Sequence, residues 1–476
     1  MSPHGVALLC LVMVNAPLDP GTGGTAASAD ASGDQSNPCA GATDLRAPDP
    51  RCGEALDGRA SPAEPSRPLK VARATLWVPR GLLWAVYWPV VETSAFVEAH
   101  HLVDWADAIL TTDDGEIGVR PVATYNTSFL PTGGLRVFYR PLPGTVSEIA
   151  ASFQTAGAGA LLGDLRLRGP LSWGLSARVQ ASQRADRLFA GIGPHSKEDL
   201  EARGLGVARF AATDVSAELR WSRVVAGRLR LGLHGNVLHR DYRANGVRGG
   251  PSIATLFTTP TPACAGGRNT SNACVDPEQV PGFQTGLRLI HAGSALGWDG
   301  RDHDRGGSGV SVAVDTTFAY GVAGDPSRHI AVSGEVVAAL GNFDRVFILR
   351  GRAATVQALG SAPVPFDELV SPAGAAGMRG FADGRFRGPS GAVATAEYRW
   401  FLASRLDASL FTDVGTVSQG PTLTDFGAAR WFPDVGLGFR FYNSSGPPWK
   451  WPPLGGVELA YAPREGIRVL FALAPF

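Results

Sequence analysis

The sequence predicts an all-β protein, a sixteen-stranded antiparallel transmembrane β-barrel with a short N-terminal helical or irregular extension. Three observations predict this fold. Apolar and polar residues alternate from about residue 117 onward, as they do in strands with two different faces. Several links after odd-numbered predicted strands are long, and several links after even-numbered ones are short. Extracellular loops and periplasmic turns of membrane barrels differ in length in the same way. No run of eighteen apolar residues offers a spanning helix.

The composition narrows the class of protein further. The 476 residues include 43 basic and 43 acidic side chains, so the net charge is zero. A neutral chain without a polybasic run has no long-range attraction for nucleic acid, and we expect no nucleic-acid partner. Charged residues make up 18% of the chain, below the ~25% that is usual in soluble domains, and glycine is abundant. This composition favours many strands and turns over a cytosolic helical enzyme.

The N-terminal region predicts export. A short apolar run, Gly5 to Val14, is followed by small residues that end in Ala27-Ser28-Ala29. This pattern predicts a signal peptide over residues 1–29, and the alternative is an apolar tail without that role. We expect residues 30–115 to form a linker and a helical extension, since apolar residues recur at helical spacing between Val91 and Leu110. The barrel is then expected over residues 116–476.

Four cysteines form two pairs that are close in sequence. Cys39 lies near Cys52, and Cys264 lies near Cys274, each pair in a stretch rich in loop-forming residues. In an exported chain such pairs predict the disulfides Cys39–Cys52 and Cys264–Cys274. A metal site is the alternative, but no histidine lies at ligand spacing beside either pair. The sequence therefore predicts no metal and no cofactor.

No motif for catalysis stands out. The chain has no Gly-x-Ser-x-Gly elbow, phosphate loop or dinucleotide fingerprint between a strand and a helix. We therefore do not expect an enzyme. An outer-membrane hydrolase whose serine and histidine lie far apart in sequence is the alternative.

The alternation defines sixteen predicted strands. They begin near residues 117, 133, 147, 161, 173, 205, 226, 284, 309, 328, 345, 391, 405, 430, 455 and 467. In the clearest, residues 228–240, leucines at every second position oppose arginines and His234. A soluble sandwich also alternates, but its polar face meets solvent outside and its loops have no reason to sort by length. The sorting of the loops favours the membrane barrel.

The polar faces of these strands predict arginines in the barrel interior. Such a lumen would be positively biased and could favour anions. Pairing with lumen acids such as Asp164 and Glu335 is the alternative. The predicted inward arginines are Arg166, Arg168, Arg178, Arg228, Arg230, Arg288, Arg350, Arg352 and Arg440.

One loop and two strands form a charged constellation. The sequence Gly377-Met378-Arg379-Gly380-Phe381 lies in a Gly/Pro/Ala-rich stretch, which predicts a loop. Glu397 and Asp413 lie at polar positions of the next two predicted strands, so both project to the same face. An arginine between two carboxylates can form bidentate, charge-assisted hydrogen bonds that fix a long loop.

These three segments resemble the BamA/TamA outer-membrane assembly family, the bacterial surface-antigen type of β-barrel. Barrels of that family carry a Val-Arg-Gly-Phe/Tyr loop that folds into the lumen. The resemblance implies that Arg379, Gly380 and Phe381 form this loop, and that Glu397 and Asp413 are the acidic partners of its arginine. Most family members also carry periplasmic POTRA modules, for which the region before residue 115 lacks the strand pattern.

The resemblance implies a role in inserting or translocating proteins at the bacterial outer membrane. The implied partners are outer-membrane lipid, client outer-membrane proteins and a separate periplasmic partner. A passive pore or a structural barrel without assembly activity is the alternative. The chain ends in Phe476 on an alternating strand, which resembles the C-terminal signal by which outer-membrane barrels are recognised for assembly.

Overall fold

The structure of the chain is a computed structural model. It describes residues 111–473, with gaps at 141–147, 170–173, 203, 248–249, 261–271, 302–307, 343–344, 404, 423–424, 427–429 and 443–452. Before residue 111 it describes Trp88, Glu92, Thr93, Phe96, Ala99, His100, Trp105 and residues 108–110, which are helical except for a turn at His100. The predicted signal peptide, Cys39, Cys52, Cys264 and Phe476 lie outside the described residues.

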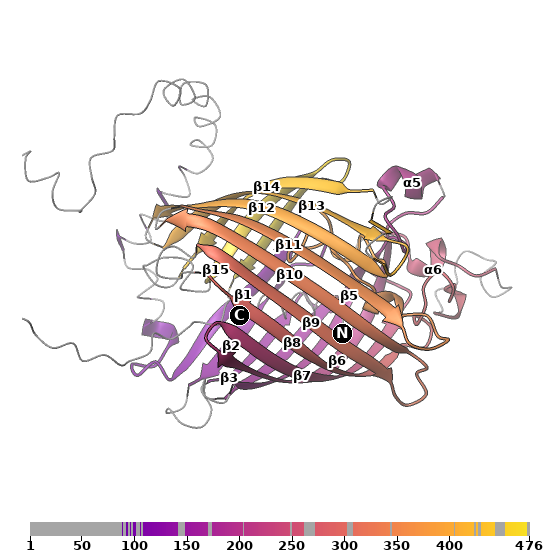
Figure 1. Cartoon of the computed structure of the whole chain (residues 1–476), viewed down its shortest axis with the longest axis horizontal. Coiled ribbons are helices and arrows are strands. Elements are labelled where there is room, and N and C mark those ends of the chain that lie inside the picture. Colours follow the sequence, from indigo (N-terminus) through magenta and orange to yellow (C-terminus); the bar gives the residue numbers. More distant parts are fainter. Residues whose placement is uncertain are drawn as a thin grey trace, which may run out of the picture. The chain divides into compact units, whose positions relative to one another are not determined.

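Sixteen antiparallel strands form one closed barrel (Figure 1), in which each strand pairs with its neighbours in sequence and β16 returns to β1. Every predicted strand begins within three residues of an observed one, so the predicted fold class is confirmed. The strands are β1 (Ile117–Asn126), β2 (Thr132–Tyr139), β3 (Glu148–Thr155), β4 (Ala160–Arg168), β5 (Leu175–Phe189), β6 (Ala208–Ala226), β7 (Leu229–Arg243), β8 (Leu287–Asp299), β9 (Gly309–Gly321), β10 (Arg328–Asn342), β11 (Arg345–Ala358), β12 (Ser390–Ala403), β13 (Leu406–Ser418), β14 (Phe432–Phe441), β15 (Gly455–Ala462) and β16 (Gly466–Leu473).

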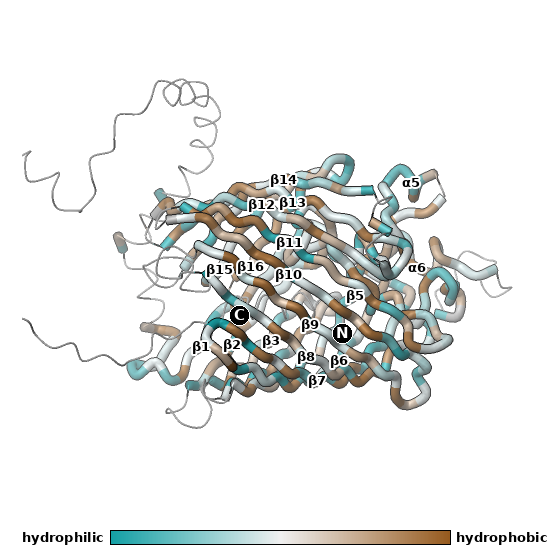
Figure 2. The backbone as a smooth tube through the Cα atoms, viewed as in Figure 1, coloured by the Kyte–Doolittle hydropathy of each residue, from teal (hydrophilic) through white to brown (hydrophobic). Residues whose placement is uncertain are grey.

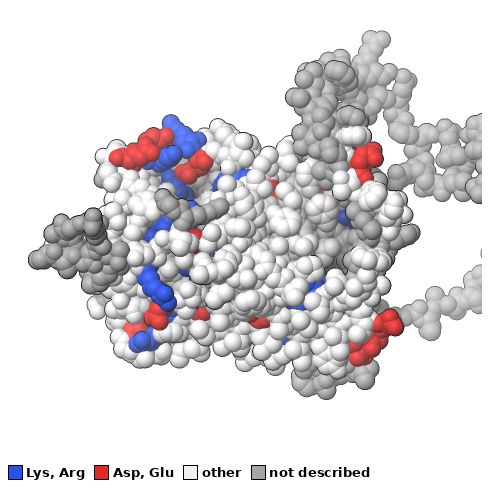
Figure 3. All heavy atoms as spheres, turned by 180° about the vertical axis from the view of Figure 1, so that it is seen from behind, with Lys and Arg blue, Asp and Glu red and all other residues white. Residues whose placement is uncertain are grey.

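The outer surface of the barrel is apolar. Large apolar side chains at every second strand position are exposed, among them Leu135, Val137, Phe153, Leu165, Val179, Leu219, Val237, Phe318 and Leu349. Apolar and polar positions alternate along the strands in Figure 2, and in Figure 3 the charged side chains gather toward the ends of the visible face. This arrangement suits a hydrocarbon environment around the strands. Among the described residues, no helix has the length and hydropathy needed to cross a membrane.

The inner surface is polar, and many of its charges are paired. Asp164 accepts hydrogen bonds from Arg166 and Arg178, and Glu335 forms an ion pair with Arg352. These contacts follow the alternative in which lumen arginines are neutralised by lumen acids. Arg288 was wrongly predicted to face inward. On β8 the inward-facing positions are Leu287 and every second residue after it, so Arg288, between two buried neighbours, is exposed on the outer face.

Two long links shape one end of the barrel. The link between β7 and β8, residues 244–286, contains α6 (Ile253–Leu256) and the 3-10 helix η2 (Asn272–Cys274). The link between β11 and β12, residues 359–389, contains the 3-10 helix η4 (Phe366–Glu368), while α5 (Lys197–Ala202) follows β5. Figure 1 shows α5 and α6 at the same end. Cys274 is buried in η2, and because Cys264 is not described, its pairing with Cys274 stays a prediction.

The link 359–389, called the lumen loop below, packs against the inside of the barrel through two apolar clusters. Its first half contributes Phe366 to a cluster with Phe189, Phe210, Tyr242 and Phe283. Its second half contributes residues to a second cluster, formed by Ala373, Met378, Phe381, Phe386, Val393, Val417, Phe432 and Ala462. The loop is therefore fixed by buried apolar contacts at both of its halves.

Candidate functional site

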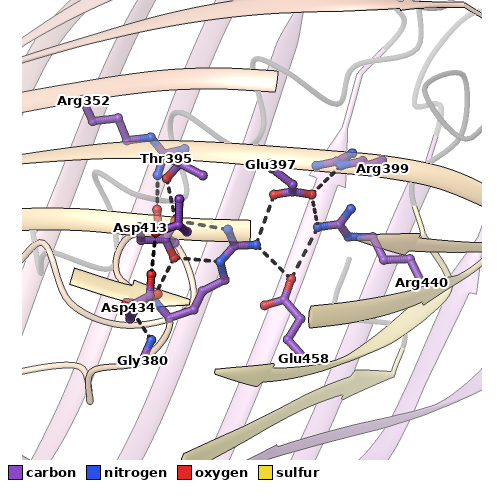
Figure 4. Close-up of polar contacts among 12 residues, drawn as sticks. Arg352, Gly380, Thr395, Glu397, Arg399, Asp413, Asp434, Arg440 and Glu458 are labelled. Carbon is purple, nitrogen blue, oxygen red and sulfur yellow. Dashed lines mark hydrogen bonds and ion pairs between the residues drawn. The ribbon is translucent and has the colours of Figure 1, made fainter. Parts of the chain in front are cut away.

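The guanidinium of Arg379 in the lumen loop lies between the two predicted carboxylates. Its Nε donates to Asp413 Oδ2 at 2.9 Å and its Nη2 to Asp413 Oδ1 at 3.1 Å, a bidentate contact. Its Nη1 donates to Glu397 Oε2 at 3.1 Å. All three residues are buried. The structure thus brings together the arginine and both acids, and Figure 4 labels the two acids. The role of this contact as a latch stays a prediction.

The pairing of β12 with β13 explains why the two acids meet one arginine. Thr395 pairs with Asp413, and Glu397 pairs with Phe411, in an unbroken antiparallel register. All four residues project to the inner face, since alternate residues of a strand share a side. Thr395 Oγ1 also donates to Asp413 Oδ1 at 2.7 Å and so orients the carboxylate. The register therefore presents two neighbouring acids to the loop.

Three residues that sequence reasoning missed complete the contact with the loop. Phe411 lies under the guanidinium, with Arg379 Cζ 3.3 Å from the ring centroid, a cation–π contact. Asp434 on β14 accepts a hydrogen bond from the backbone N–H of Gly380 at 2.9 Å. Glu458 on β15 lies 3.4 Å from Arg379 Nη1. The sequence offered one sign of this contact: Phe411 is an aromatic residue at a position of its strand that otherwise carries polar, inward-facing side chains.

Further arginines balance the acids around this centre. Arg440 Nη2 donates to Glu397 Oε1 at 2.9 Å and lies 3.4 Å from Glu458 Oε1, while Arg399 Nε donates to Glu397 Oε1 at 2.5 Å. Burial alone would lower the pKa of the Arg379 guanidinium, but Glu458, Asp413 and Glu397 together raise that pKa above its ordinary value. The arginine is therefore held in its charged form inside the barrel.

Two glycines, Gly380 in the lumen loop and Gly415 on β13, allow the loop to lie close to the strands of the barrel wall. A Cβ at Gly380 would lie 2.5 Å from Asp434 Cβ and 3.0 Å from Ala462 Cβ. A Cβ at Gly415 would lie 2.6 Å from the sulfur of Met378. Phe381 is buried in the second apolar cluster. Gly380 and Phe381 therefore take part in the docking of the loop, which uses backbone proximity as well as charge.

A second ionic centre holds the first half of the lumen loop. Asp367 in η4 accepts a hydrogen bond from Arg240 on β7, and its other oxygen lies 2.8 Å from Arg387 Nη2 near the end of the loop. Arg240 also binds Asp214 on β6. All four residues are buried. The loop is thus clamped by ion pairs to β7 as well as to β12, β13 and β15.

This arrangement is a clamp of paired charges that joins the lumen loop to the barrel wall. The planar guanidinium groups match the geometry of the carboxylates, so each ion pair fixes the orientation of the two side chains as well as their distance. Removing one partner would leave the others buried and uncompensated, which makes the clamp cooperative.

Comparison with known proteins gives a family for part of the chain. Residues 288–448 match the Omp85 superfamily domain. These residues run from β8 to the end of β14 and include the lumen loop, Glu397 and Asp413. No curated protein sequence matches the chain.

Solved structures also resemble the chain. BamA from Haemophilus ducreyi lacking POTRA domains 1-3 is 15% identical, with a TM-score of 0.49, over 75% of this chain and 70% of that one. CdiB from Escherichia coli is 12% identical, with a TM-score of 0.45, over 75% of this chain and 62% of that one. CdiB from Acinetobacter baumannii is 11% identical, with a TM-score of 0.43, and 59% of its length is covered by 75% of this chain.

The closed barrel of sixteen strands, the arginine loop in its lumen and the family match agree with one another. Among the described residues, no βααββ module of the POTRA kind precedes β1. The protein is an outer-membrane β-barrel whose residues 288–448 match the Omp85 superfamily domain.

Proposed function

We propose that this barrel inserts or translocates proteins at the outer membrane, and that client strands pair with the edge of β1. The observation that carries the proposal is the short seam between the first and last strands. Among the described residues, which end at Leu473, Ala123–Asn126 of β1 pair with Leu470–Leu473 of β16, which gives four residue pairs. The flanking pairings, β1 with β2 and β15 with β16, have eight residue pairs each.

The sequence of β1 itself weakens the seam. Thr127 N–H donates across the seam to the carbonyl of Val469 at 3.1 Å. Since every second residue of a strand points its backbone groups to the same side, position 121 also faces the seam. Pro121 occupies that position and has no N–H to donate. Among the described residues, Val119 and Pro121 have no backbone partner across the seam.

A seam that is held by few hydrogen bonds supports strand addition. Unpaired N–H and C=O groups on a sheet edge are a template for another strand, and few seam bonds must open to extend that edge. The Omp85 superfamily domain favours the same role. A periplasmic partner encoded separately would deliver clients to the edge, and outer-membrane lipid would surround the strands.

A reversible lock of the seam tests this function. Thr124 pairs with Ala472 across the seam and with Thr132 inside the β1–β2 hairpin. We expect a disulfide in Thr124→Cys/Ala472→Cys to stop the protein, in liposomes, from accelerating the folding of an unfolded eight-stranded outer-membrane barrel. Addition of a reductant to the same sample should restore the acceleration. Folding of the client is measured by its heat-modifiable shift on a gel.

The matched control is Thr124→Cys/Thr132→Cys, whose disulfide joins the same residue of β1 to its hairpin neighbour. The two threonine hydroxyls lie 2.6 Å apart, so this lock leaves the seam free and should leave the acceleration intact. Equal client folding with the seam locked and unlocked would overturn the proposal. An unmodified barrel that does not accelerate client folding and conducts ions steadily would favour the passive pore.

A further inference from the structure

Three buried side chains with metal-binding chemistry meet inside the barrel, away from Arg379. His291 lies on β8, His329 on β10 and Glu368 in η4 of the lumen loop. Their candidate ligand atoms all lie within 4.8 Å of one another. The side chains are at most 3% exposed. Sequence reasoning predicted no metal site, because these residues are brought together only by the barrel and the loop.

The strand register explains the meeting of the two histidines. His291 and His329 both pair with Ala319 of the intervening strand β9. They therefore stand at one level of the barrel wall, on either side of a small side chain. Since alternate residues share a face, both rings project inward with Ala319, which is buried. The alanine leaves the space between the rings open to Glu368.

The distances fit a first-row divalent cation. His291 Nε2 lies 3.3 Å from Glu368 Oε2, and His329 Nε2 lies 3.5 Å from the same oxygen. Zn–N and Zn–O bonds of about 2.0–2.2 Å place tetrahedral ligand atoms about 3.3–3.5 Å apart. Two edges of a tetrahedral site are thus present. A small rotation of the imidazole rings would bring the two nitrogens to the same spacing.

A neighbouring amide supports the tautomer that a metal needs. The Asn236 side-chain amide on β7 lies 3.5 Å from His291 Nδ1, with its nitrogen toward the ring. Asn236 Oδ1 is buried and has no hydrogen-bond partner among the described residues. Exchanging the amide oxygen and nitrogen, which are interchangeable by rotation, lets Oδ1 accept from Nδ1–H. That bond leaves the lone pair of His291 Nε2 directed at Glu368, as in metal-bound histidines.

The three ligands also border open space. His291, His329 and Glu368 line a cavity of about 750 Å³ inside the barrel. We propose that His291, His329 and Glu368 bind one Zn²⁺ ion, which fastens the lumen loop to β8 and β10 and keeps a fourth position toward the cavity for water or a small anion. Two histidines and one carboxylate with an open fourth position form a ligand set that suits zinc.

Titration calorimetry on the refolded, chelator-treated barrel tests the site, with Zn²⁺ alone as the probe. We expect one high-affinity ion per chain in the wild type. His291→Gln, His329→Gln and Glu368→Gln should each abolish that binding, and Asn236→Ala should weaken it by about 10–100-fold. Co²⁺ bound in place of Zn²⁺ should give the strong visible absorption of a tetrahedral site. Zinc should also slow proteolysis within the lumen loop in the wild type.

The matched control is His239→Gln. His239 lies on β7, where it is exposed and pairs with Asp241, so the variant should bind zinc as the wild type does. Glu368→Gln keeps the shape of the side chain, and its heat-modifiability on a gel verifies that the barrel is folded. Equal zinc binding by the wild type and a folded Glu368→Gln variant would mean binding elsewhere. Failure of the wild type to bind zinc would also overturn the proposal.

Discussion

A single side chain, Arg379, joins the lumen loop to several strands at once. Its contacts reach Glu397 on β12, Asp413 on β13 and Glu458 on β15, and the ring of Phe411 supports its planar face. Lysine could not reproduce this geometry, because an ammonium is a point charge without a planar fork. The identity of the residue therefore matters as much as its charge.

Replacing Arg379 with alanine should destabilise the docked loop by roughly 3–5 kcal/mol, because the buried carboxylate of Asp413 loses its compensating charge. The measurement is limited proteolysis of the lumen loop together with urea unfolding of the refolded barrel. Arg399→Ala is the control: that side chain is more exposed, and Glu397 keeps Arg379 and Arg440 in its absence. An Arg379→Ala loop as resistant to protease as the wild-type loop would contradict a latch.

At the scale of the element, docking of the lumen loop against the barrel wall requires a residue without a side chain at position 380. Gly380 approaches Asp434 and Ala462 so closely that a methyl group has no space. By contrast, Gly360 in the same link has no heavy atom within 4 Å of its hypothetical Cβ. Alanine substitutions at these two glycines therefore distinguish a loss of stability caused by a steric clash with the wall from one caused by reduced backbone flexibility.

Gly380→Ala should weaken docking of the loop by about 1–3 kcal/mol, the usual cost of overpacking, and should break the hydrogen bond from Gly380 N–H to Asp434. Gly360→Ala should leave stability within experimental error. Urea unfolding of both variants provides the comparison. Equal stability of the two variants would show that the wall yields to the added methyl group.

The elements themselves follow from the sequence more closely than their contacts do. Period-two alternation is a local property, so strand positions could be predicted to within a few residues. The parity of Glu397 and Asp413 could be predicted for the same reason. Asp434, Glu458 and the meeting of His291 with His329 depend on the registers between strands and on the path of a long loop. Those are set by closure of the barrel, and no local pattern encodes them.

At the scale of the whole molecule, the barrel is closed by a short seam and filled by an anchored loop. Its surface is apolar outside, and many of its inner charges are paired. Paired charges give little net field, which argues against strong anion selectivity. A plugged interior also predicts limited ion flow through the molecule.

Planar-bilayer recordings should therefore show a small, variable conductance for the wild type. Arg379→Ala should raise the conductance and change its fluctuations, because the second half of the loop is released from β12–β15. Arg430→Ala, which removes an exposed ion pair with Asp199, should leave the recordings unchanged. A large, steady conductance that does not respond to Arg379→Ala would show that the loop does not obstruct the lumen.

The two anchors of the lumen loop differ in how far along the chain they reach. Arg379 binds partners 18 to 79 residues away, all later in the sequence. Asp367 binds Arg240, which lies 127 residues earlier. Bringing distant residues together costs more chain entropy, and such contacts form late in folding. We expect the second half of the loop to dock first on an open sheet of β12–β15, so that the loop is already inside when the barrel closes around it.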